Sequence, residues 1–141
     1  MSVSNDDAPV FMRPGHNAGD LVEAGRWQIL IEETGLVEVE AHLPRHLLNP
    51  RNQLFGGFTG TYVDMISLYA CRTLYQKSSD FTWSATVNMR IDYLAPVVGP
   101  RFRLRGEVIS NGRSTCLVGS TFTDLQGNKL VYAITTLRKN A

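Results

Sequence analysis

Hydrophobic and polar residues alternate in the first third of the chain and again after residue 85. In residues 27–31 and 37–43 apolar side chains occupy every second position, and Thr34-Gly35 between these runs is a turn signal. Further alternating or β-branched runs cover residues 86–93, 101–108, 114–124 and 129–138. The pattern therefore predicts six strands, several of which turn one face toward water.

Short turn motifs separate the later runs. Asn111-Gly112 is the strongest short hairpin signal, and Gln126-Gly127-Asn128 supplies the next turn. Strands that are joined by tight turns pair in the antiparallel sense. The sequence therefore predicts an antiparallel sheet.

The period changes to 3.6 residues between the second and third strand-like runs, from Gly56 to Gln76. This predicted helix carries only two charged residues, Asp64 and Arg72. A helix that is apolar on most sides has to be buried, so we expect it to pack across the concave face of the sheet. The expected fold class is α+β, with one long central helix wrapped by a curved sheet of about six strands. One helix covers only part of such a sheet, so we also expect a dimer or a dimer of dimers.

Length and composition indicate one globular domain. The 141 residues divide into a flexible arm over residues 1–20 and a single domain over residues 21–141. The content of 43% hydrophobic and 19% charged residues argues against a disordered chain or a coiled coil. No apolar run approaches the ~18 residues of a membrane span, and the acidic N-terminus is not a secretory signal. Cys71 and Cys116 lie in apolar segments, which favours reduced thiols and a cytoplasmic location.

The net charge of +1 is unevenly distributed. Residues 1–40 carry eight acidic and two basic residues, whereas residues 41–141 carry five acidic and twelve basic residues. A pI near 7.8 is too low for the usual nucleic-acid-binding protein. The basic excess is compatible with a smaller polyanion, such as a nucleotide-bearing cofactor, and equally with the solvated faces of strands.

Small and polar residues form a stripe along one side of the predicted helix. Its members are three or four positions apart: Gly57, Gly60, Asp64, Ser67 and Cys71. Such a stripe permits close approach by a strand, a second helix or a ligand. Asp is a poor residue for a helix interior, and a desolvated carboxylate beside a cleft is a candidate base or nucleophile. The alternative is an ordinary Asp on a solvated helix face.

Gly56 and Gly57 open the helix, where the first N–H groups lack an intrahelical acceptor and the helix dipole is positive. Amides without neighbouring Cβ atoms are suited to receive the carbonyl oxygen of an ester or thioester as that oxygen gains negative charge. The alternative is that the two glycines only allow a tight turn into the helix.

The segment from Asn49 to Asp64 resembles the loop-and-helix signature of hotdog-fold acyl-CoA thioesterases, most closely the phenylacetic-acid-degradation type. That signature reads Asn, five residues, His-Gly-Gly, six residues, Asp. Asn49, Gly56, Gly57 and Asp64 fall on it without gaps, and Phe55 occupies the position of the histidine. The resemblance extends in element order over roughly residues 35–139.

The resemblance implies hydrolysis of a small or aromatic acyl-CoA, similar to phenylacetyl-CoA, to the free acid and coenzyme A. Asp64 would be the general base or nucleophile, and the Gly56 amide, helped by Gly57, would hold the thioester oxygen. Asn49 would orient the water or the carbonyl, and Thr86 would lie near the attacking water. In such enzymes the site lies between two subunits, so Asp64 and Thr86 can come from different chains.

Two arginines are candidates for the phosphates of coenzyme A. Arg113 follows the Asn111-Gly112 turn, where backbone amides and a guanidinium can both meet a phosphate. Arg90 is the second candidate, because alternation places it on one strand face with Thr86. We expect no metal and no redox cofactor, since coenzyme A is part of the substrate.

The departure at Phe55 defines the main alternative. The change removes any contribution of a histidine side chain, although an aromatic ring is suited to line an acyl pocket. The alternative function is a protein that binds an acyl-CoA or a small aromatic compound without catalysis. A sister family that hydrates enoyl-CoA has a histidine five residues after its Asp. That position is Tyr69 in this chain, so a hydratase is disfavoured.

Overall fold

The computed structural model describes residues 11–75 and 84–140. The strands of this part of the chain are β1 (Gln28–Glu33), β2 (Leu36–His42), β3 (Ala85–Tyr93), β4 (Arg101–Asn111), β5 (Thr115–Thr123) and β6 (Lys129–Arg138). Its helices are α1 (Asn17–Leu21), α2 (Thr59–Arg72) and the short 3-10 helices η2 (Ala24–Arg26), η3 (Arg45–Leu47) and η4 (Gly56–Phe58). None of the described helices has the length and apolar character that a membrane crossing requires.

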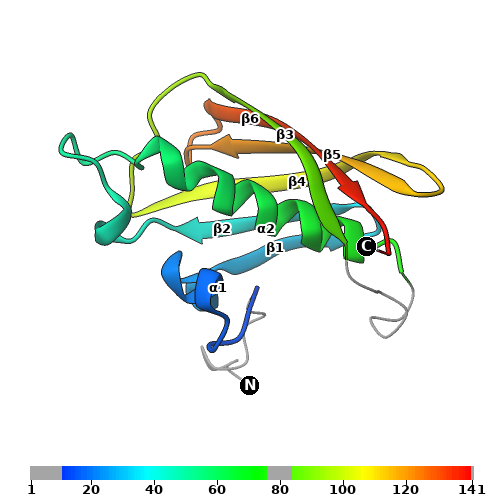
Figure 1. The fold of residues 1–141 in the computed structure, drawn as a ribbon. Helices are drawn as coiled ribbons and strands as arrows, with labels where there is room; N and C mark the ends of the chain where they lie inside the picture. Colours follow the sequence, from blue (N-terminus) through cyan, green and yellow to red (C-terminus); the bar gives the residue numbers. More distant parts are fainter. Residues whose placement is uncertain (1–10, 76–83, 141) are drawn as a thin grey trace.

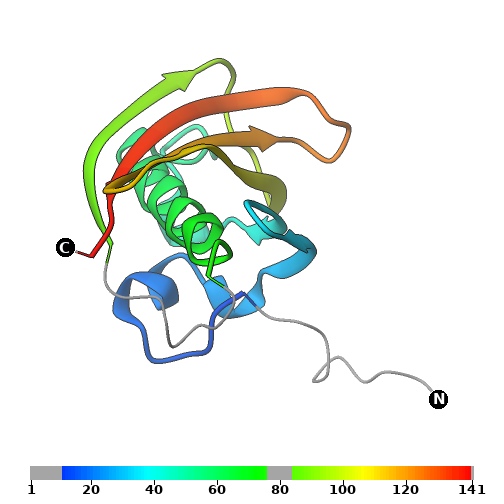
Figure 2. The same cartoon turned by 90° about the vertical axis from the view of Figure 1, so that its right-hand side faces the viewer.

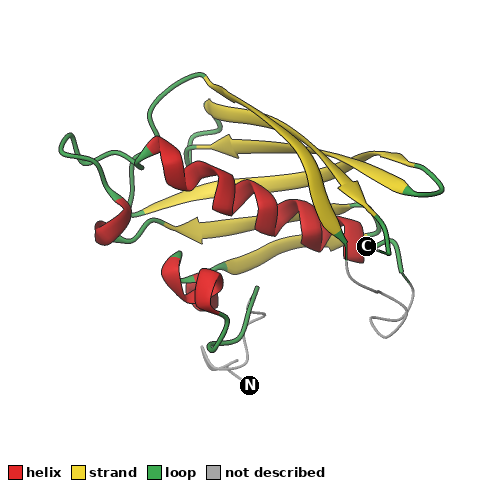
Figure 3. Cartoon of the chain, in the orientation of Figure 1, coloured by secondary structure: helices red, strands yellow, loops and turns green. Residues whose placement is uncertain are grey.

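The six strands form one sheet in the order β1-β2-β4-β5-β6-β3, and every neighbouring pair is antiparallel. The sheet curves around α2, which runs along its concave face (Figures 1 and 2). Coloured by secondary structure, the molecule shows one long helix against a single layer of strands (Figure 3). The predicted α+β architecture is confirmed, and β1 and β3 are the two edges of the sheet.

The contact between α2 and the sheet is close at the centre. Val37, Val39 and Ala41 alternate on the inner face of β2 and are buried, as their spacing predicts. On β4, Gly106 lies against the helix, where a Cβ atom would sit 3.0 Å from the carbonyl oxygen of Ile66. A side chain at this position would push the helix away by a few tenths of an ångström, because the atom that would have to move belongs to the helix backbone.

The helix is shorter than its hydrophobic period predicts. Gly56–Phe58 form a 3-10 turn rather than α-helix, and α2 ends at Arg72. The Thr73 hydroxyl donates to the carbonyl of Ala70 at 2.6 Å and accepts from the Gly35 amide at 2.8 Å. These bonds tie the helix end to the β1–β2 turn, which hydrophobic periodicity does not reveal. The expected last residue, Gln76, lies outside the described residues.

Residues from Phe11 onward pack with the domain. The Phe11 side chain is buried, and its ring centroid lies 4.9 Å from that of Trp27 and 4.8 Å from that of Tyr69. The His16 imidazole caps α1 by accepting from the Gly19 amide at 3.0 Å. Residues 1–10 lie outside the described residues, and the domain boundary at residue 21 stays a prediction.

His42, at the end of β2, faces the segment that follows α1. Its Nδ1 lies 3.0 Å from the Oε2 atom of Glu23, and its side chain is largely buried. Burial lowers the pKa of His42 below its ordinary value of 6.5, and the positive charges of Arg26 and Arg101 act in the same direction. The Glu23 carboxylate opposes this shift but does not reverse it. The neutral imidazole is therefore the form that the fold favours.

We predict that the protein loses stability as the pH falls below about 6.5, because the unfolded chain then binds a proton that folded His42 resists. The contribution is present above the unfolded pKa and is lost as the pH falls toward the folded one. Urea unfolding at a series of pH values measures it. The His42→Gln variant should show a shallower pH dependence than the wild type. Equal slopes for wild type and His42→Gln would contradict the prediction.

Candidate functional site

Asp64 lies in the middle of α2 and points toward the edge strand β3. The Thr86 hydroxyl donates a short hydrogen bond to its Oδ1 atom. Asp64 is half-buried between apolar neighbours on the helix, Val63 and Met65, both of which are buried. Two of the predicted site residues therefore meet within one chain, and this pair needs no second subunit.

A β-bulge decides which residues of β3 face the helix. The register against β6 shifts between Thr86 and Asn88, so that Thr86 and Met89, rather than Thr86 and Arg90, lie on the inner face. The expectation that Arg90 shares a face with Thr86 is therefore wrong. The Arg90 side chain is on the outer face, and its Nε lies 3.4 Å from the carboxylate of Asp92.

The small stripe of the helix faces the sheet. A Cβ atom on Gly60 would lie 3.7 Å from the sulfur of Met89 on β3. One turn beyond Asp64, the buried hydroxyls of Ser67 and Ser120 are 3.3 Å apart. Of the three partners that the stripe permits, the structure therefore shows a neighbouring strand. Among these stripe residues Asp64 alone carries a charge.

The two cysteines lie together at the end of this stripe. Cys71 and Cys116 are both buried with free thiols and belong to one apolar cluster with Leu137. A hydrogen bond from Cys116 lowers the pKa of Cys71 to about 7, and the same pairing raises the pKa of Cys116. Their free thiols, buried within an apolar cluster, agree with the reduced cysteines that the sequence indicates.

The start of the helix presents two backbone donors. Within the described parts of the chain, the amides of Gly56 and Gly57 have no hydrogen-bond acceptor. The Phe55 amide, in contrast, donates to the carbonyl of Leu47 at 2.9 Å. The Phe55 side chain is 52% exposed and lies over Gly57, where a Cβ atom would be 3.0 Å from the ring. An aromatic ring therefore flanks the two free amides.

Asn49 organises the loop before the helix. Its Oδ1 atom accepts from the amides of Arg51 at 2.9 Å and Gln53 at 3.0 Å, which is an Asx-turn. The side-chain oxygen is therefore engaged in the loop. Any contact of Asn49 with a water molecule or a substrate falls to its side-chain nitrogen.

Tyr93 is a site residue that sequence reasoning missed. It is the last residue of β3, and its hydroxyl donates to the carbonyl of Gly56 at 2.8 Å. The alternation of β3 assigns Tyr93 only to the apolar face of a strand. A tyrosine at a strand end carries a polar tip, but no sequence signal links that tip to a loop 37 residues away.

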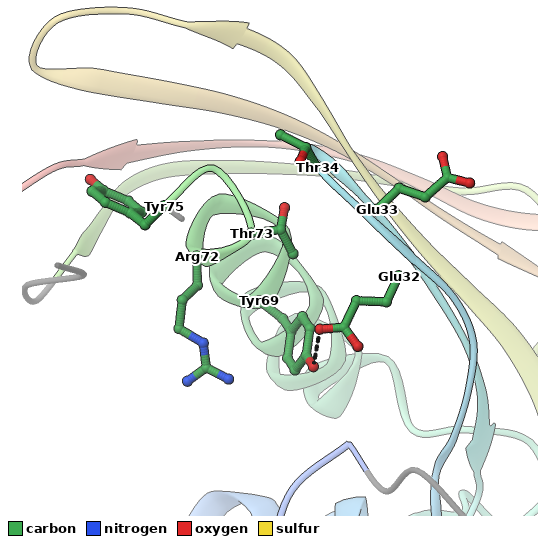
Figure 4. Close-up of a pocket in the computed structure, with 7 residues that line it drawn as sticks. All are labelled: Glu32, Glu33, Thr34, Tyr69, Arg72, Thr73 and Tyr75. Carbon is green, nitrogen blue, oxygen red and sulfur yellow. Dashed lines mark hydrogen bonds between the residues drawn. The ribbon is translucent and has the colours of Figure 1, made fainter. Parts of the chain in front are cut away.

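A cavity of about 350 Å³ adjoins the start of α2. Its wall is mainly apolar and comprises Gln53, Leu54, Thr59, Tyr93, Leu94, Ala95, Pro96, Val97 and Val131. A second hollow of about 510 Å³ lies at the other end of α2, where the Tyr69 hydroxyl donates to Glu32 at 2.8 Å (Figure 4). The second hollow has a polar wall that contains none of the predicted site residues.

The basic excess divides between paired and unpaired side chains. On the outer face of β4, Arg101 lies 3.3 Å from the carboxylate of Glu40, and Arg105 lies 3.9 Å from that of Glu38. These pairs fit the solvated-face interpretation. Arg113 is exposed in the β4–β5 hairpin and has no ion-pair partner among residues 11–75 and 84–140. Figure 1 shows this hairpin on the side of the C-terminal end of α2, away from the start of that helix.

Comparisons with known proteins place this chain in a family and identify solved structures with a similar fold. The family model described as "Thioesterase superfamily" matches residues 52–131, which is more than half of the chain. A search of curated proteins finds no match.

Similar solved structures include zebra fish thioesterase superfamily member 2, with 24% identity, a TM-score of 0.75 and coverage of 91% of this chain and 88% of that chain. A hypothetical thioesterase from Streptococcus pneumoniae TIGR4, solved with coenzyme A, has 23% identity, a TM-score of 0.72 and coverage of 82% and 87%. The PaaI protein of the E. coli phenylacetic acid degradation operon has 16% identity, a TM-score of 0.71 and coverage of 87% and 88%. The predicted hotdog fold is confirmed by these likenesses.

Proposed function

Because the chain belongs to the thioesterase superfamily, we propose that it hydrolyses an acyl-CoA thioester to a free acid and coenzyme A. The observation that carries this proposal is the half-buried carboxylate of Asp64, which lies on a helix with almost no other charge. The hydroxyl of Thr86, on the neighbouring strand β3, holds this carboxylate by a hydrogen bond. A carboxylate in such surroundings is suited to act as a base or a nucleophile. We further propose that the reaction needs no metal and no redox cofactor.

In the proposed reaction, Asp64 takes a proton from water as the water oxygen bonds to the thioester carbon. The carbonyl oxygen gains negative charge, which the amides of Gly56 and Gly57 stabilise. The C–S bond then breaks, and the proton passes from Asp64 to the leaving thiolate. If Asp64 instead attacks the thioester carbon directly, the C–S bond breaks as a mixed anhydride forms, and the leaving thiolate takes a proton from solvent; water then hydrolyses the anhydride and regenerates the carboxylate. Thr86 holds the carboxylate in place in either route, and Asn49 orients the water or the carbonyl.

The spacing of Gly56 and Asp64 supports a site built from two copies of the chain. Gly56 and Asp64 are eight positions apart, which corresponds to about 12 Å along an α-helix. A carboxylate that activates a water, and an amide that binds the carbonyl oxygen, need to lie within about 8 Å of each other. The Gly56 amide of one chain is therefore too far from Asp64 of the same chain. The distance can be met if the Gly56 amide of one copy faces Asp64 of a second copy. We therefore propose a dimer or a dimer of dimers, for which the edge strand β3 offers unpaired backbone groups.

The 350 Å³ cavity at the helix start supports a small or aromatic acyl group, similar to phenylacetyl. Leu94, Pro96 and Val97 give it an apolar wall, and the exposed ring of Phe55 flanks the neighbouring amides. The PaaI neighbour, whose printed name refers to phenylacetic acid degradation, is compatible with this class of substrate.

For the coenzyme portion we propose Arg113 as the phosphate contact, because it is exposed and its guanidinium is free of acidic partners among the described residues. The pneumococcal neighbour was solved with coenzyme A, which supports a coenzyme A ester as the ligand. Arg90 is a weaker choice, since it pairs with Asp92 on the outer face. The free, buried thiols of Cys71 and Cys116 support a cytoplasmic location.

The position of Phe55 favours one alternative, a protein that binds an acyl-CoA or a small aromatic compound without hydrolysis. Its ring occupies the position of the family histidine and lies against Gly57, 3.0 Å from the point where a Cβ atom would be. The two functions differ in one measurement. Thiol release from a panel of acyl-CoA esters occurs with an enzyme, whereas a binding protein shows saturable binding without release.

We predict that Asp64→Asn lowers kcat by at least about 100-fold, because an amide cannot accept the proton of water. Thiol release with the best substrate of the panel measures this. Glu107→Gln, which neutralises an exposed carboxylate on the outer face of β4, serves as the matched control and should keep wild-type turnover. Near-normal turnover by Asp64→Asn would show that another group is the base.

We predict that Gly56→Pro lowers kcat by about 100-fold, whereas Gly56→Ala retains most activity, because only proline removes the N–H donor. The backbone before Gly56 suits proline, and the space beside Gly56 accepts a Cβ atom. Phe55 has φ −62° and ψ 125°, the conformation that a residue before proline prefers, and an added Cβ lies 3.7 Å from Tyr93. Equal activities of the two variants would remove the Gly56 amide from the reaction.

Mixing the two inactive variants tests the two-copy site. In a dimer of Asp64→Asn with Gly56→Pro, one site receives Gly56 from the first chain and Asp64 from the second, so it is intact. Random pairing should restore about a quarter of wild-type activity. If both groups act within one chain, every site carries a defect and mixing restores no activity.

A further inference from the structure

We infer that Tyr93 is a positioning residue that holds the Gly56–Gly57 peptide, so that the Gly57 amide is a fixed second donor to the thioester oxygen. This inference rests on the proposed hydrolysis and extends it to a residue outside the family signature. It starts from the hydrogen bond between the end of β3 and the start of the helix.

The carbonyl oxygen of Gly56 receives two hydrogen bonds. The Tyr93 hydroxyl donates to it at 2.8 Å, and the backbone amide of Thr59 donates to the same atom from within the helix. Both lone pairs of the oxygen are therefore engaged. The Tyr93 ring also packs beside Gly56, with its Cε1 atom 3.7 Å from the point where a Cβ atom would lie. The oxygen is thus held from the helix side and from the strand side.

A held carbonyl determines the direction of the next amide. The peptide unit is planar, and in the trans form the C=O of one residue and the N–H of the next point in opposite directions. Fixing the Gly56 oxygen therefore fixes the Gly57 N–H, which has no acceptor among the described residues. A hydrogen bond to the carbonyl also polarises the peptide and strengthens the N–H as a donor. Glycine backbone is otherwise more mobile than that of other residues.

The same strand contacts both reactive groups of the chain. Thr86 near the start of β3 bonds the Asp64 carboxylate, and Tyr93 at its end bonds the peptide beside the free amides. Tyr93 also contributes to the wall of the cavity at the helix start. Its side chain is 58% exposed, so its burial adds little to the core. The role of the Tyr93 hydroxyl is therefore to hold the Gly56–Gly57 peptide in one orientation, rather than to stabilise the core by packing.

The test removes only the hydroxyl, with Tyr93→Phe. Tyr132→Phe is the matched control, since Tyr132 lies on β6 on the outer face of the sheet and outside the site. We expect Tyr93→Phe to lower kcat about ten-fold with KM changed less than about two-fold, since loosening a donor costs less than removing it. Tyr132→Phe should have wild-type constants. A general loss of structure would instead appear as a lower unfolding midpoint.

A second measurement does not depend on turnover. In ¹H–¹⁵N spectra, loss of the bond to the Gly56 carbonyl should move the Gly57 amide resonance, relative to wild type and Tyr132→Phe. An unchanged Gly57 resonance overturns the inference, because the hydroxyl then does not hold the peptide. A changed resonance with unchanged kcat also overturns it, provided that Asp64→Asn is inactive. If the wild-type protein hydrolyses no thioester, the proposed function fails, and the catalytic role of Tyr93 fails with it.

Discussion

The structure depends on the burial of a helix that has almost no polar side. α2 carries few charges, and eight of its residues are buried, so it is stable only inside the curve of a sheet. The hydrophobic effect supplies the driving force, and backbone contact at Gly106 brings sheet and helix close enough to exclude water. This packing also gives the candidate site its character. Any polar group on such a helix loses water and needs a partner from the sheet.

Ser67 and Asp64 show how the sheet supplies such partners. Ser67 meets Ser120 in the interior, where two neutral hydroxyls satisfy each other at low cost. Asp64 lies nearer the edge of the sheet, where Thr86 provides one hydrogen bond and the remaining carboxylate surface is only partly covered. Because one oxygen is held while the group keeps an open side, the carboxylate can be both ordered and accessible. That combination is what a general base or nucleophile requires.

The edge strand β3 connects the two ends of the site. The bulge near Thr86 turns that side chain toward the helix while Arg90 points outward, and Tyr93 at the strand end reaches the helix start. A strand without this bulge would present Arg90 and Thr86 on one face. The position of this one β-bulge thus decides which side chains of β3 contact the helix and which contact solvent.

The sequence by itself determined the fold class, the order of the elements and the likeness to hotdog thioesterases, because these follow from local patterns. The alternation in residues 37–43, the change of period at Gly56 and the spacing of Asn49, Gly57 and Asp64 are all legible along the chain. The stripe of small and polar residues around Asp64 was also visible in the sequence, although the strands that pack against it were not. Contacts between residues far apart in sequence were decided only by the tertiary structure.

The end of α2 is one such case, since it depends on a bond between Thr73 and the β1–β2 turn. The face of Arg90 is another, because a bulge forms only against a neighbouring strand. Tyr93 is the third, since its hydroxyl finds Gly56 only when β3 lies along the helix. In each case the local pattern permits several partners. The packing of helix and sheet selects one of them, because it fixes which backbone and side-chain groups come within hydrogen-bond distance.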